Sequence, residues 1–170
     1  MNEVEVKILE RKHSDYKDIL LKHGFKKVFD GIIEQKYWER KDFEKGFSLR
    51  IRTENDISVL TMKERRKNSK AKSRKETNVF IDNKEKMEAI LKKIGLHEDT
   101  DIVKQRISYK KGNVKVEFDR HIKKYSFIPE FMEIESTNYQ EISKVARILG
   151  IEEKYLLSWM FKDLVKKYKK

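Results

Sequence analysis

The sequence contains no cysteine, 1 proline and 6 glycines among its 170 residues. The lack of cysteine excludes disulfides and thiolate metal sites. Because proline and glycine are so scarce, there is little room for long linkers, and we predict a single domain over residues 1–170. The sequence also lacks an apolar run of the ~20 residues needed to span a bilayer, and its first residues lack the basic and apolar regions of a signal peptide. We therefore expect a cytoplasmic protein without a membrane segment.

Histidines are few, and charge of one sign dominates. The 4 histidines, His13, His23, His97 and His121, show no metal-ligand spacing. A zinc site is therefore not expected, and a metal here would be a hard cation held by carboxylate oxygens. Charged residues make up 41% of the chain, and the net charge is +12. This excess favours anionic partners but does not distinguish nucleic acid, anionic lipid or polyphosphate, and a lysine-rich surface alone would also produce it.

Alternation of polar and apolar residues predicts about eight strands, many of them antiparallel. Short polar connections at 54–56 and 110–113 predict hairpins. We place the strands at 3–8, 25–39 (bent near Gly31), 47–53, 57–65, 73–81, 102–109, 114–121 and 130–136.

Helix start and stop signals separate these strands. We predict helices at 15–22 after Ser14, at 84–93 between Asn83 and Gly95, and from Asn138 to Gly150. A last helical stretch is predicted at 158–167. Segment 63–75 is dense in Lys, Arg, Ser and Asn, so it must include a mobile loop. The pattern as a whole predicts an α+β domain.

Like charges recur two positions apart on the predicted strands, and residues i and i+2 of a strand share a face. Taken singly, each pair is typical of the wet side of an ordinary sheet. As a set they repel one another unless opposite charges lie between them. An arrangement that uses all of them is a closed barrel with a charged interior, in which acidic pairs hold Mg²⁺ or Mn²⁺ and basic pairs grip phosphate oxygens. The charged residues that share a strand face, of like or of opposite sign, are Glu3 with Glu5 and Lys7, Arg50 with Arg52, Arg74 with Glu76, Lys104 with Arg106, Glu117 with Asp119, and Glu133 with Glu135, and Lys63 belongs on an equivalent face.

These segments resemble those of the CYTH or triphosphate tunnel metalloenzyme superfamily over nearly the whole chain. Glu3-Val4-Glu5-Val6-Lys7 matches the N-terminal Glu-x-Glu-x-Lys strand of that family in motif and place. The other matching segments follow in family order: Leu49-Arg50-Ile51-Arg52, Leu60-Thr61-Met62-Lys63, Ser73-Arg74-Lys75-Glu76, Lys104-Gln105-Arg106 before Tyr109, Phe118-Asp119, Phe131-Met132-Glu133-Ile134-Glu135 and Leu157-Ser158-Trp159.

The resemblance implies an eight-stranded antiparallel β-barrel with helices packed outside and a triphosphate bound in its tunnel. It implies metal ligands at Glu3, Glu5, Asp119, Glu133 and Glu135, with Mg²⁺ or Mn²⁺ as the cofactor. Phosphate oxygens would be bound by Lys7, Arg50, Arg52, Lys63, Arg74, Lys104 and Arg106. The catalytic residues would be Glu3, Glu5, Lys7, Lys63 and Arg106, whereas Glu76 and Glu117 could instead orient a neighbouring cation.

Departures from the family pattern concern substrate identity. Ile33, Gln35 and Asn78 replace common polar residues of the family, and Ile128-Pro129 replaces its Leu-Gly. We favour a class IV adenylyl cyclase (a lyase) that converts ATP to cyclic AMP and pyrophosphate, with Tyr37, Trp38 or Phe47 available as an aromatic slot for adenine.

Other readings stay open at this stage. They are a hydrolase, such as an inorganic tripolyphosphatase, a thiamine triphosphatase or a nucleoside or RNA triphosphatase, and a non-catalytic RNA-binding module that uses residues 63–75. The expected partners are ATP or tripolyphosphate, and the protein would be a monomer or a homodimer.

Overall fold

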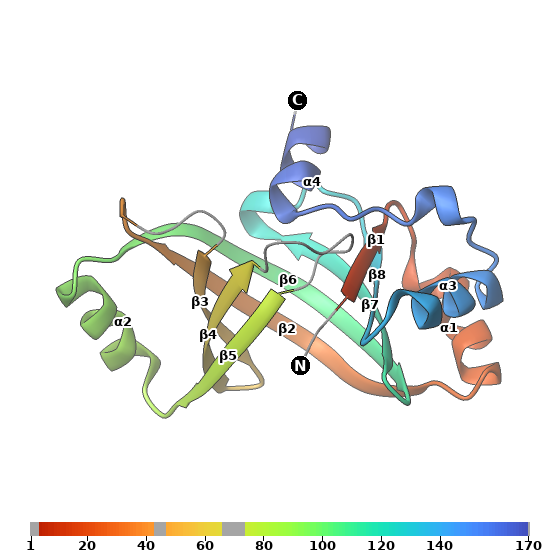
Figure 1. Ribbon diagram of the computed structural model, residues 1–170, viewed down its shortest axis with the longest axis horizontal. Coiled ribbons are helices and arrows are strands. Elements are labelled where there is room, and N and C mark those ends of the chain that lie inside the picture. The colour runs from red at the N-terminus through yellow and green to blue at the C-terminus, as the bar shows by residue number, and fades with distance from the viewer. Residues whose placement is uncertain (1–3, 43–46, 66–73, 170) are drawn as a thin grey trace.

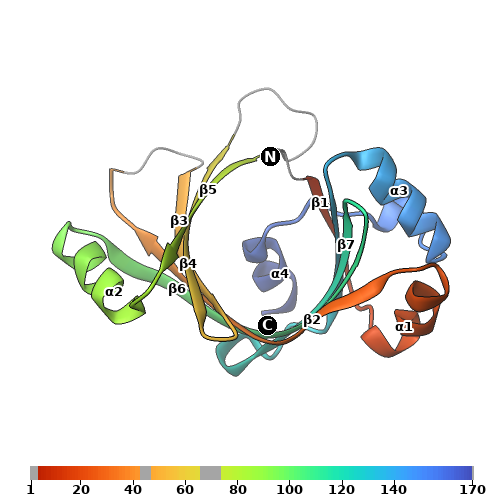
Figure 2. The same cartoon turned by 90° about the horizontal axis from the view of Figure 1, so that it is seen from below.

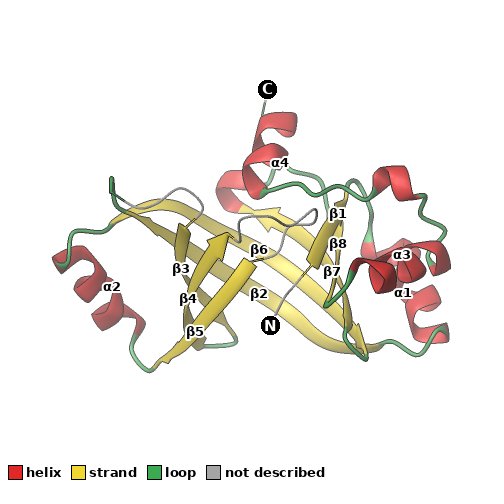
Figure 3. Cartoon of the chain, viewed as in Figure 1, coloured by secondary structure: helices red, strands yellow, loops and turns green. Residues whose placement is uncertain are grey.

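The computed structural model describes residues 4–42, 47–65 and 74–169. Its strands form an 8-stranded antiparallel sheet in the order β1-β8-β7-β6-β2-β3-β4-β5, with α2 at one end of the molecule, α1 and α3 at the other, and α4 between them above the strands (Figure 1, Figure 3). The predicted α+β class is confirmed. The strands are β1 Val4–Ile8, β2 Lys26–Glu39, β3 Phe47–Glu54, β4 Ile57–Arg65, β5 Arg74–Ile81, β6 His97–Lys111, β7 Val114–Ile122 and β8 Phe131–Ser136, and the helices are α1 His13–Lys22, α2 Lys84–Lys93, α3 Tyr139–Ile148 and α4 Phe161–Tyr168.

The sheet curls strongly, so that its edge strands β1 and β5 turn toward each other around an open interior (Figure 2). Within the described ranges, β1 pairs with β8 and β5 pairs with β4, and no ladder joins β1 to β5. The structure therefore shows a curved open sheet, and closure into a barrel stays a prediction. We call the side of the sheet that faces the interior the concave face.

Apolar residues line the outer, convex side of the sheet and pack under helices at both ends. At one end, Val116 and Ile134 of the sheet meet Leu20 of α1 and Ile142 of α3, and all four side chains are fully buried. At the other end, Ile51 packs with Leu91 of α2 and with other apolar side chains. Burying an aliphatic side chain stabilises a fold by about 1.5–3 kcal/mol. The apolar alternates of the strands thus face outward, as the closed-barrel interpretation required.

The C-terminal helix departs from the predicted arrangement, in which all helices lie outside. α4 lies at one open end of the curled sheet, above the strands in Figure 1 and across the opening in Figure 2, and Leu164 is fully buried there in a cluster with Ile102, Tyr125 and Phe131. Ile102 and Phe131 belong to the concave face, because their register partners Gln35 and Asp119 lie in its polar rows. α4 therefore covers one part of the concave face with an apolar cap.

Both predicted hairpins are present. β3 and β4 are joined at Asn55 and Asp56, whose φ angles are 45° and 66°. Left-handed conformations at both central residues suit a tight two-residue turn, and Asn and Asp tolerate them best among residues other than glycine. β6 and β7 pair around Gly112. β6 begins at His97, earlier than predicted, because its polar first residues pair with the end of β2. The irregularities of β2 lie at Lys27/Phe29 and Lys36/Trp38, and not at the predicted position Gly31.

Helix starts agree with the sequence where a local cap is present. The side chain of Asn83 accepts a hydrogen bond from the backbone N–H of Lys86 (2.8 Å), and that of Asn138 accepts one from Glu141 (3.0 Å). The prediction that Ser14 caps α1 is wrong. α1 begins at His13, whose backbone N–H donates to the carboxylate of Glu130 (2.6 Å), a residue far along the chain. A tertiary contact thus replaces the local cap.

The last helix begins at Phe161, three residues after its predicted start at Ser158. The chain just before it is held extended, because Lys7 and Leu157 exchange backbone hydrogen bonds of 2.8 and 2.9 Å. Asp163 then accepts a bond from the backbone N–H of Met160 (2.6 Å), which fixes the start of α4. No helix in the described part of the chain has the length and apolar character needed to cross a membrane.

Candidate functional site

The strand register brings the charged pairs onto one surface, the concave face. Lys7 lies opposite Glu133, Glu133 opposite Glu117, and Asp119 opposite Arg106. On the other half of the sheet, Gln35 of β2 lies opposite Arg52, and Lys63 lies opposite Glu76. The face carries Glu5, Lys7, Arg50, Arg52, Lys63, Glu76, Lys104, Arg106, Glu117, Asp119, Glu133 and Glu135.

A dense ionic network occupies the half of the concave face built by β1, β8, β7 and β6. Its centre is Arg106, which forms ion pairs with Glu117, with Asp119 (2.5 Å) and with Glu133 (2.8 Å). Arg106 is only 7% exposed and Asp119 is fully buried. Burial alone would lower the pKa of the guanidinium, but the carboxylates around it raise this pKa well above the usual value. Arg106 therefore stays charged and cross-links three strands.

Lysines complete this network. Lys7 donates to Glu133 and lies 3.7 Å from Glu5, and Lys104 donates to Asp119 at 2.5 Å. Burial alone would raise the pKa of Glu133, yet Lys7, Lys104 and Arg106 hold this pKa well below its usual range. The buried cations Lys7, Lys104 and Arg106 balance the buried anions Glu117, Asp119 and Glu133. This half of the face is therefore close to neutral in itself.

The half of the concave face built by β2, β3 and β4 is different, because it holds an excess of buried positive charge. Arg50 is only 9% exposed, its Nε has no hydrogen-bond partner, and no carboxylate of the described residues forms an ion pair with it. Its neighbour is the hydroxyl of Tyr37, the register partner of Arg50. Burial alone would raise the pKa of Tyr37, but Arg50, Lys104 and Lys63 lower it. Three cations therefore act on one half-buried phenol, which marks a point of positive potential on the concave face.

The remaining cations of this half are partly engaged. Arg52 pairs with Glu54 at 2.5 Å, and Lys63 pairs with Glu76. Their side chains are 32% and 14% exposed respectively. Both can turn toward a ligand on the concave face, because each forms a single ion pair within the described residues.

His121 lies on the same face, beside Lys104 in the register and against Phe131, Tyr125 and the α4 residue Phe161. It is 4% exposed, and neither ring nitrogen has a hydrogen-bond partner within the described chain. Burial, aided by repulsion from Lys104, lowers the pKa of His121 to about 4. The imidazole is therefore neutral at neutral pH.

We expect the NMR ring resonances of His121 to stay constant from about pH 8 down to pH 5.5, since its pKa in the fold is about 4. In denaturant the same resonances should titrate near pH ~6.5. The unfolded chain takes up this proton first, so His121 contributes stability above pH ~6.5 that is lost as the pH falls toward about 4. A midpoint near 6.5 in the folded protein would show that the ring is hydrated.

Carboxylates that suit a hard divalent cation are present, but they are engaged in ion pairs. Glu5 lies opposite Glu135 in the register, next to the row of Lys7 and Glu133. Glu135 pairs with Lys115 at 3.0 Å, and Glu133 with Lys7. Among the residues of 4–42, 47–65 and 74–169, no three acidic or histidine side chains gather as a metal site. Carboxylate oxygens are suitable ligands for Mg²⁺ or Mn²⁺. To surround an ion, Glu133 and Glu135 would first have to leave their ion pairs with Lys7 and Lys115.

Some predicted positions fall outside this description. Glu3 lies outside the described residues, as does most of segment 63–75, where RNA contact and a mobile loop were predicted. Arg74 stands opposite Arg65 at the start of β5, and its side chain is not among those described. Of the aromatic residues suggested for adenine, Trp38 is 1% exposed in the outer core, and Phe47 shares the convex side with Leu49. Tyr37 alone of these three lies on the concave face.

Sequence reasoning missed several members of the face. Ser108 donates to Glu117 (3.1 Å), Glu54 pairs with Arg52, and His121 lies beside Lys104. Each of the three is two positions from a charged residue of the set, so the same alternation that identified the pairs also identifies them.

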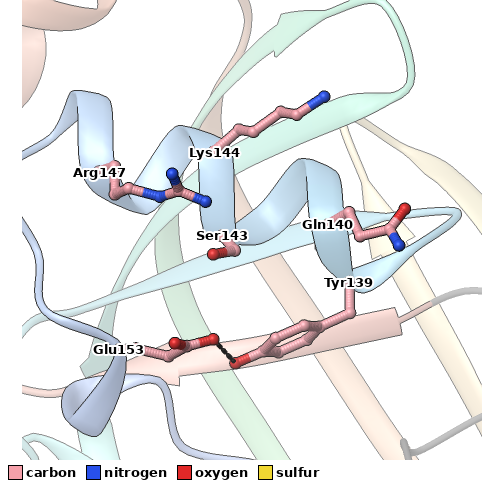
Figure 4. A pocket seen from close by; sticks show the side chains of 6 residues that line it. All are labelled: Tyr139, Gln140, Ser143, Lys144, Arg147 and Glu153. Carbon is pink, nitrogen blue, oxygen red and sulfur yellow. Dashed lines mark hydrogen bonds between the residues drawn. The ribbon is translucent and has the colours of Figure 1, made fainter.

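A separate hollow lies on the outer surface, away from the concave face (Figure 4). It has a volume of about 350 Å³ and is bordered by α3 and the turn after it. The hydroxyl of Tyr139 donates to Glu153 across it at 3.2 Å. None of its residues belongs to the charged set, so we assign the candidate site to the concave face. The hollow is lined by Tyr139, Gln140, Ser143, Lys144, Arg147 and Glu153.

The chain is similar to known proteins in sequence and in fold. Residues 1–159 match the family model of the CYTH domain. "Putative adenylate cyclase MJ0240" of Methanocaldococcus jannaschii is 35% identical over 122 residues, which cover 70% of each protein. A conserved hypothetical protein of Pyrococcus furiosus has a solved structure that is 26% identical, with a TM-score of 0.79 over 95% of this chain and 99% of that one. HpAC1 from Hippeastrum shares the fold at 20% identity, with a TM-score of 0.65 over 100% of this chain and 97% of that one. The chain belongs to the CYTH domain family.

Proposed function

We propose that the chain is a divalent-metal-dependent enzyme that binds a triphosphate on the concave face, with conversion of ATP to cyclic AMP and pyrophosphate as the favoured reaction. The sheet would close between β1 and β5 around the bound triphosphate. The proposal rests on family membership together with the chemistry of the concave face, where buried cations and carboxylates share one surface.

The observation that carries the proposal is the buried Arg50, which lacks a carboxylate partner among the described residues. Burying an ionised group costs several kcal/mol unless an opposite charge compensates it. Arg50, Lys63 and Lys104 all lower the pKa of Tyr37, so their positive charges act on the same part of the concave face. A guanidinium binds two phosphate oxygens at once, and an ammonium adds a point charge. A polyphosphate therefore supplies the missing charge.

The other phosphate ligands of the proposal come from further positions on the sheet. Arg52 is two positions from Arg50 on the same face, and Lys7 reaches the face from β1. Arg74 would join them from β5. Binding of phosphate by Lys7 would release Glu133 from its ion pair, which leaves that carboxylate available.

Glu5, Glu133 and Glu135, together with Glu3, would hold Mg²⁺ or Mn²⁺. When bound, such an ion would supply positive charge to neutralise the negative charge that develops on the phosphate. The protein's own contribution is to hold the phosphates in line and to exclude water, since phosphoryl transfer depends mainly on positioning and charge stabilisation. Lys63 is held toward the concave face by Glu76 and would move to a phosphate oxygen as the substrate binds.

Hydrolysis of a triphosphate is the second candidate. The residues that support the proposal contact phosphate and metal, which both reactions share, and no base-binding group follows from them. The M. jannaschii relative carries an adenylate cyclase name, whereas HpAC1 is described as having a dominant triphosphatase activity. The two reactions differ in whether the ribose 3′-hydroxyl attacks the α-phosphate or water attacks the terminal one.

The test is product analysis with Mg²⁺ or Mn²⁺ and, separately, ATP and tripolyphosphate, beside a Glu3→Ala/Glu5→Ala control. Cyclic AMP and pyrophosphate from ATP would establish the cyclase, and phosphate from tripolyphosphate would establish the hydrolase. Turnover of neither substrate, or a control variant as active as the parent, would refute the enzymatic proposal. In that case, salt-sensitive and metal-independent binding of RNA would identify a binding module that uses residues 63–75.

A further inference from the structure

Asp119 is the most enclosed charged residue of the concave face. It is fully buried, and both carboxylate oxygens already have cationic partners. Oδ1 accepts from Nε of Arg106 (2.6 Å), and Oδ2 accepts from Nη2 of Arg106 and from Nζ of Lys104, each at 2.5 Å. Burial alone would raise the pKa of this carboxyl, but Arg106 and Lys104 lower it. Asp119 is therefore ionised, and its oxygens are committed to these two side chains.

Most N–H donors of Arg106 are likewise already bonded to carboxylates. A guanidinium has five N–H donors. Nε uses its donor on Asp119, Nη2 uses both of its donors on Asp119 and Glu133, and Nη1 pairs with Glu117. One N–H of Nη1 is left for a substrate. Arg106 therefore acts mainly as a link between carboxylates.

We propose that Asp119 is a positioning residue and not a metal ligand. It fixes Arg106, which in turn orients Glu117 and Glu133, and it holds Lys104 on the concave face. This inference rests on the proposed triphosphate chemistry and deepens it, since it separates the carboxylates into Asp119, which holds the cations, and those of β1 and β8, which would hold the metal.

The geometry explains why Asp119 takes this role and Glu133 does not. A metal at Asp119 would have to displace a bidentate arginine and a lysine from a fully enclosed carboxylate, which leaves two buried cations without partners. Glu133 gives one oxygen to Lys7 and the other to a single N–H of Arg106. Phosphate can draw Lys7 away, and Glu133 then keeps Arg106 as a support while it presents a free oxygen.

The test compares Asp119→Asn with Glu133→Gln, because asparagine and glutamine keep the shape and remove the charge. Because Lys7 occupies Glu133 until phosphate draws it away, the apparent Mn²⁺ affinity is measured at saturating substrate as the Mn²⁺ concentration that gives half-maximal turnover, and kcat and KM are measured at saturating metal. For Asp119→Asn we expect an Mn²⁺ affinity within about twofold of the parent, with kcat lowered about tenfold to a hundredfold and KM nearly unchanged. For Glu133→Gln we expect the Mn²⁺ affinity to fall at least about tenfold. Weakening of Mn²⁺ binding by Asp119→Asn to the same extent as by Glu133→Gln would overturn the inference.

A double-mutant cycle tests the ion pair between Asp119 and Lys104 independently of metal and activity. Lys104→Met/Asp119→Asn removes one charge of each sign, so we expect it to melt at a higher temperature than Asp119→Asn alone. If Asp119→Asn does not fold, the double variant takes its place in the Mn²⁺ titration. If the losses of stability in the two single variants simply add in the double variant, Asp119 does not hold Lys104, and the inference is wrong. Turnover by the parent protein that needs no divalent cation would instead refute the metal dependence in the proposed function, and the cycle would still decide the role of Asp119.

Discussion

Replacing Arg50 by glutamine is expected to lower kcat/KM for the triphosphate by about 10²–10³-fold. Arg50 is the buried cation of the concave face that has no carboxylate partner among the described residues. Its whole charge is therefore available to the phosphate. The same isolation predicts a small effect on the fold, because removing an uncompensated buried charge takes away a desolvation cost. We therefore expect the free energy of unfolding of Arg50→Gln to be no lower than that of the parent.

Steady-state kinetics and urea unfolding of matched variants measure these effects separately. Arg120→Gln removes the same charge from an exposed residue of β7 on the convex side, where Arg120 bonds Gln105. It should leave kcat/KM nearly unchanged. Arg50→Lys should recover part of the activity, since it restores the charge without the bidentate geometry. Equal losses in Arg50→Gln and Arg120→Gln would show that only net charge matters, and the assigned site would then be wrong.

Replacing Glu133 by glutamine is expected to lower the free energy of unfolding at neutral pH by about 3–5 kcal/mol. Glu133 is 9% exposed and bridges Lys7 and Arg106. Glutamine keeps the shape but leaves both cations short of one negative charge. Urea unfolding of the parent and the variant measures the loss. The matched control is Glu152→Gln. Glu152 forms a solvent-exposed ion pair of 2.8 Å with Lys154, so we expect little or no change in the free energy of unfolding.

The cost of Glu133→Gln should depend on pH in a defined direction. The cations around Glu133 hold its pKa well below the usual range, so the folded state keeps this carboxylate charged after the unfolded chain has protonated it. The stabilisation is complete above the unfolded pKa of ~4.3 and decreases as the pH falls below it toward the folded pKa. The difference between parent and variant should therefore be constant above pH ~5.5 and shrink below pH ~4. A difference that persists unchanged in acid would mean that shape, and not charge, explains the loss.

The fold could be predicted from sequence wherever local signals set the structure. Asn83 and Asn138 cap their helices with their own side chains, and Asn55-Asp56 makes a hairpin turn with its own backbone. The predictions failed where distant residues decide. Glu130 supplies the bond that starts α1, and pairing of Leu157 with Lys7 delays α4. No window of sequence around Ser14 or Ser158 contains those partners.

For the candidate site, alternation identified the side chains but not how they share charge. That Arg106 and Asp119 bind each other depends on the register of β6 against β7, which places them opposite each other. The lack of a described carboxylate near Arg50 depends on which residues β2 and β4 bring beside β3. A motif match alone assigns both Arg50 and Arg106 as phosphate ligands. The register separates Arg50, which is free for phosphate, from Arg106, which is used within the protein.

The central pair of the sheet, β2 with β6, has a consequence for how the chain folds. These strands join residues 26–39 to residues 97–111, and the hairpins on either side of the pair are local in sequence. The outermost ladder, in contrast, joins Val4 to Ser136. Closing loops of such length costs chain entropy before the contacts repay it. Topologies dominated by such non-local pairings fold on timescales of roughly milliseconds to seconds. β1, which carries Glu5 and Lys7, is thus expected to dock last, so the ionic network forms only when folding is nearly complete.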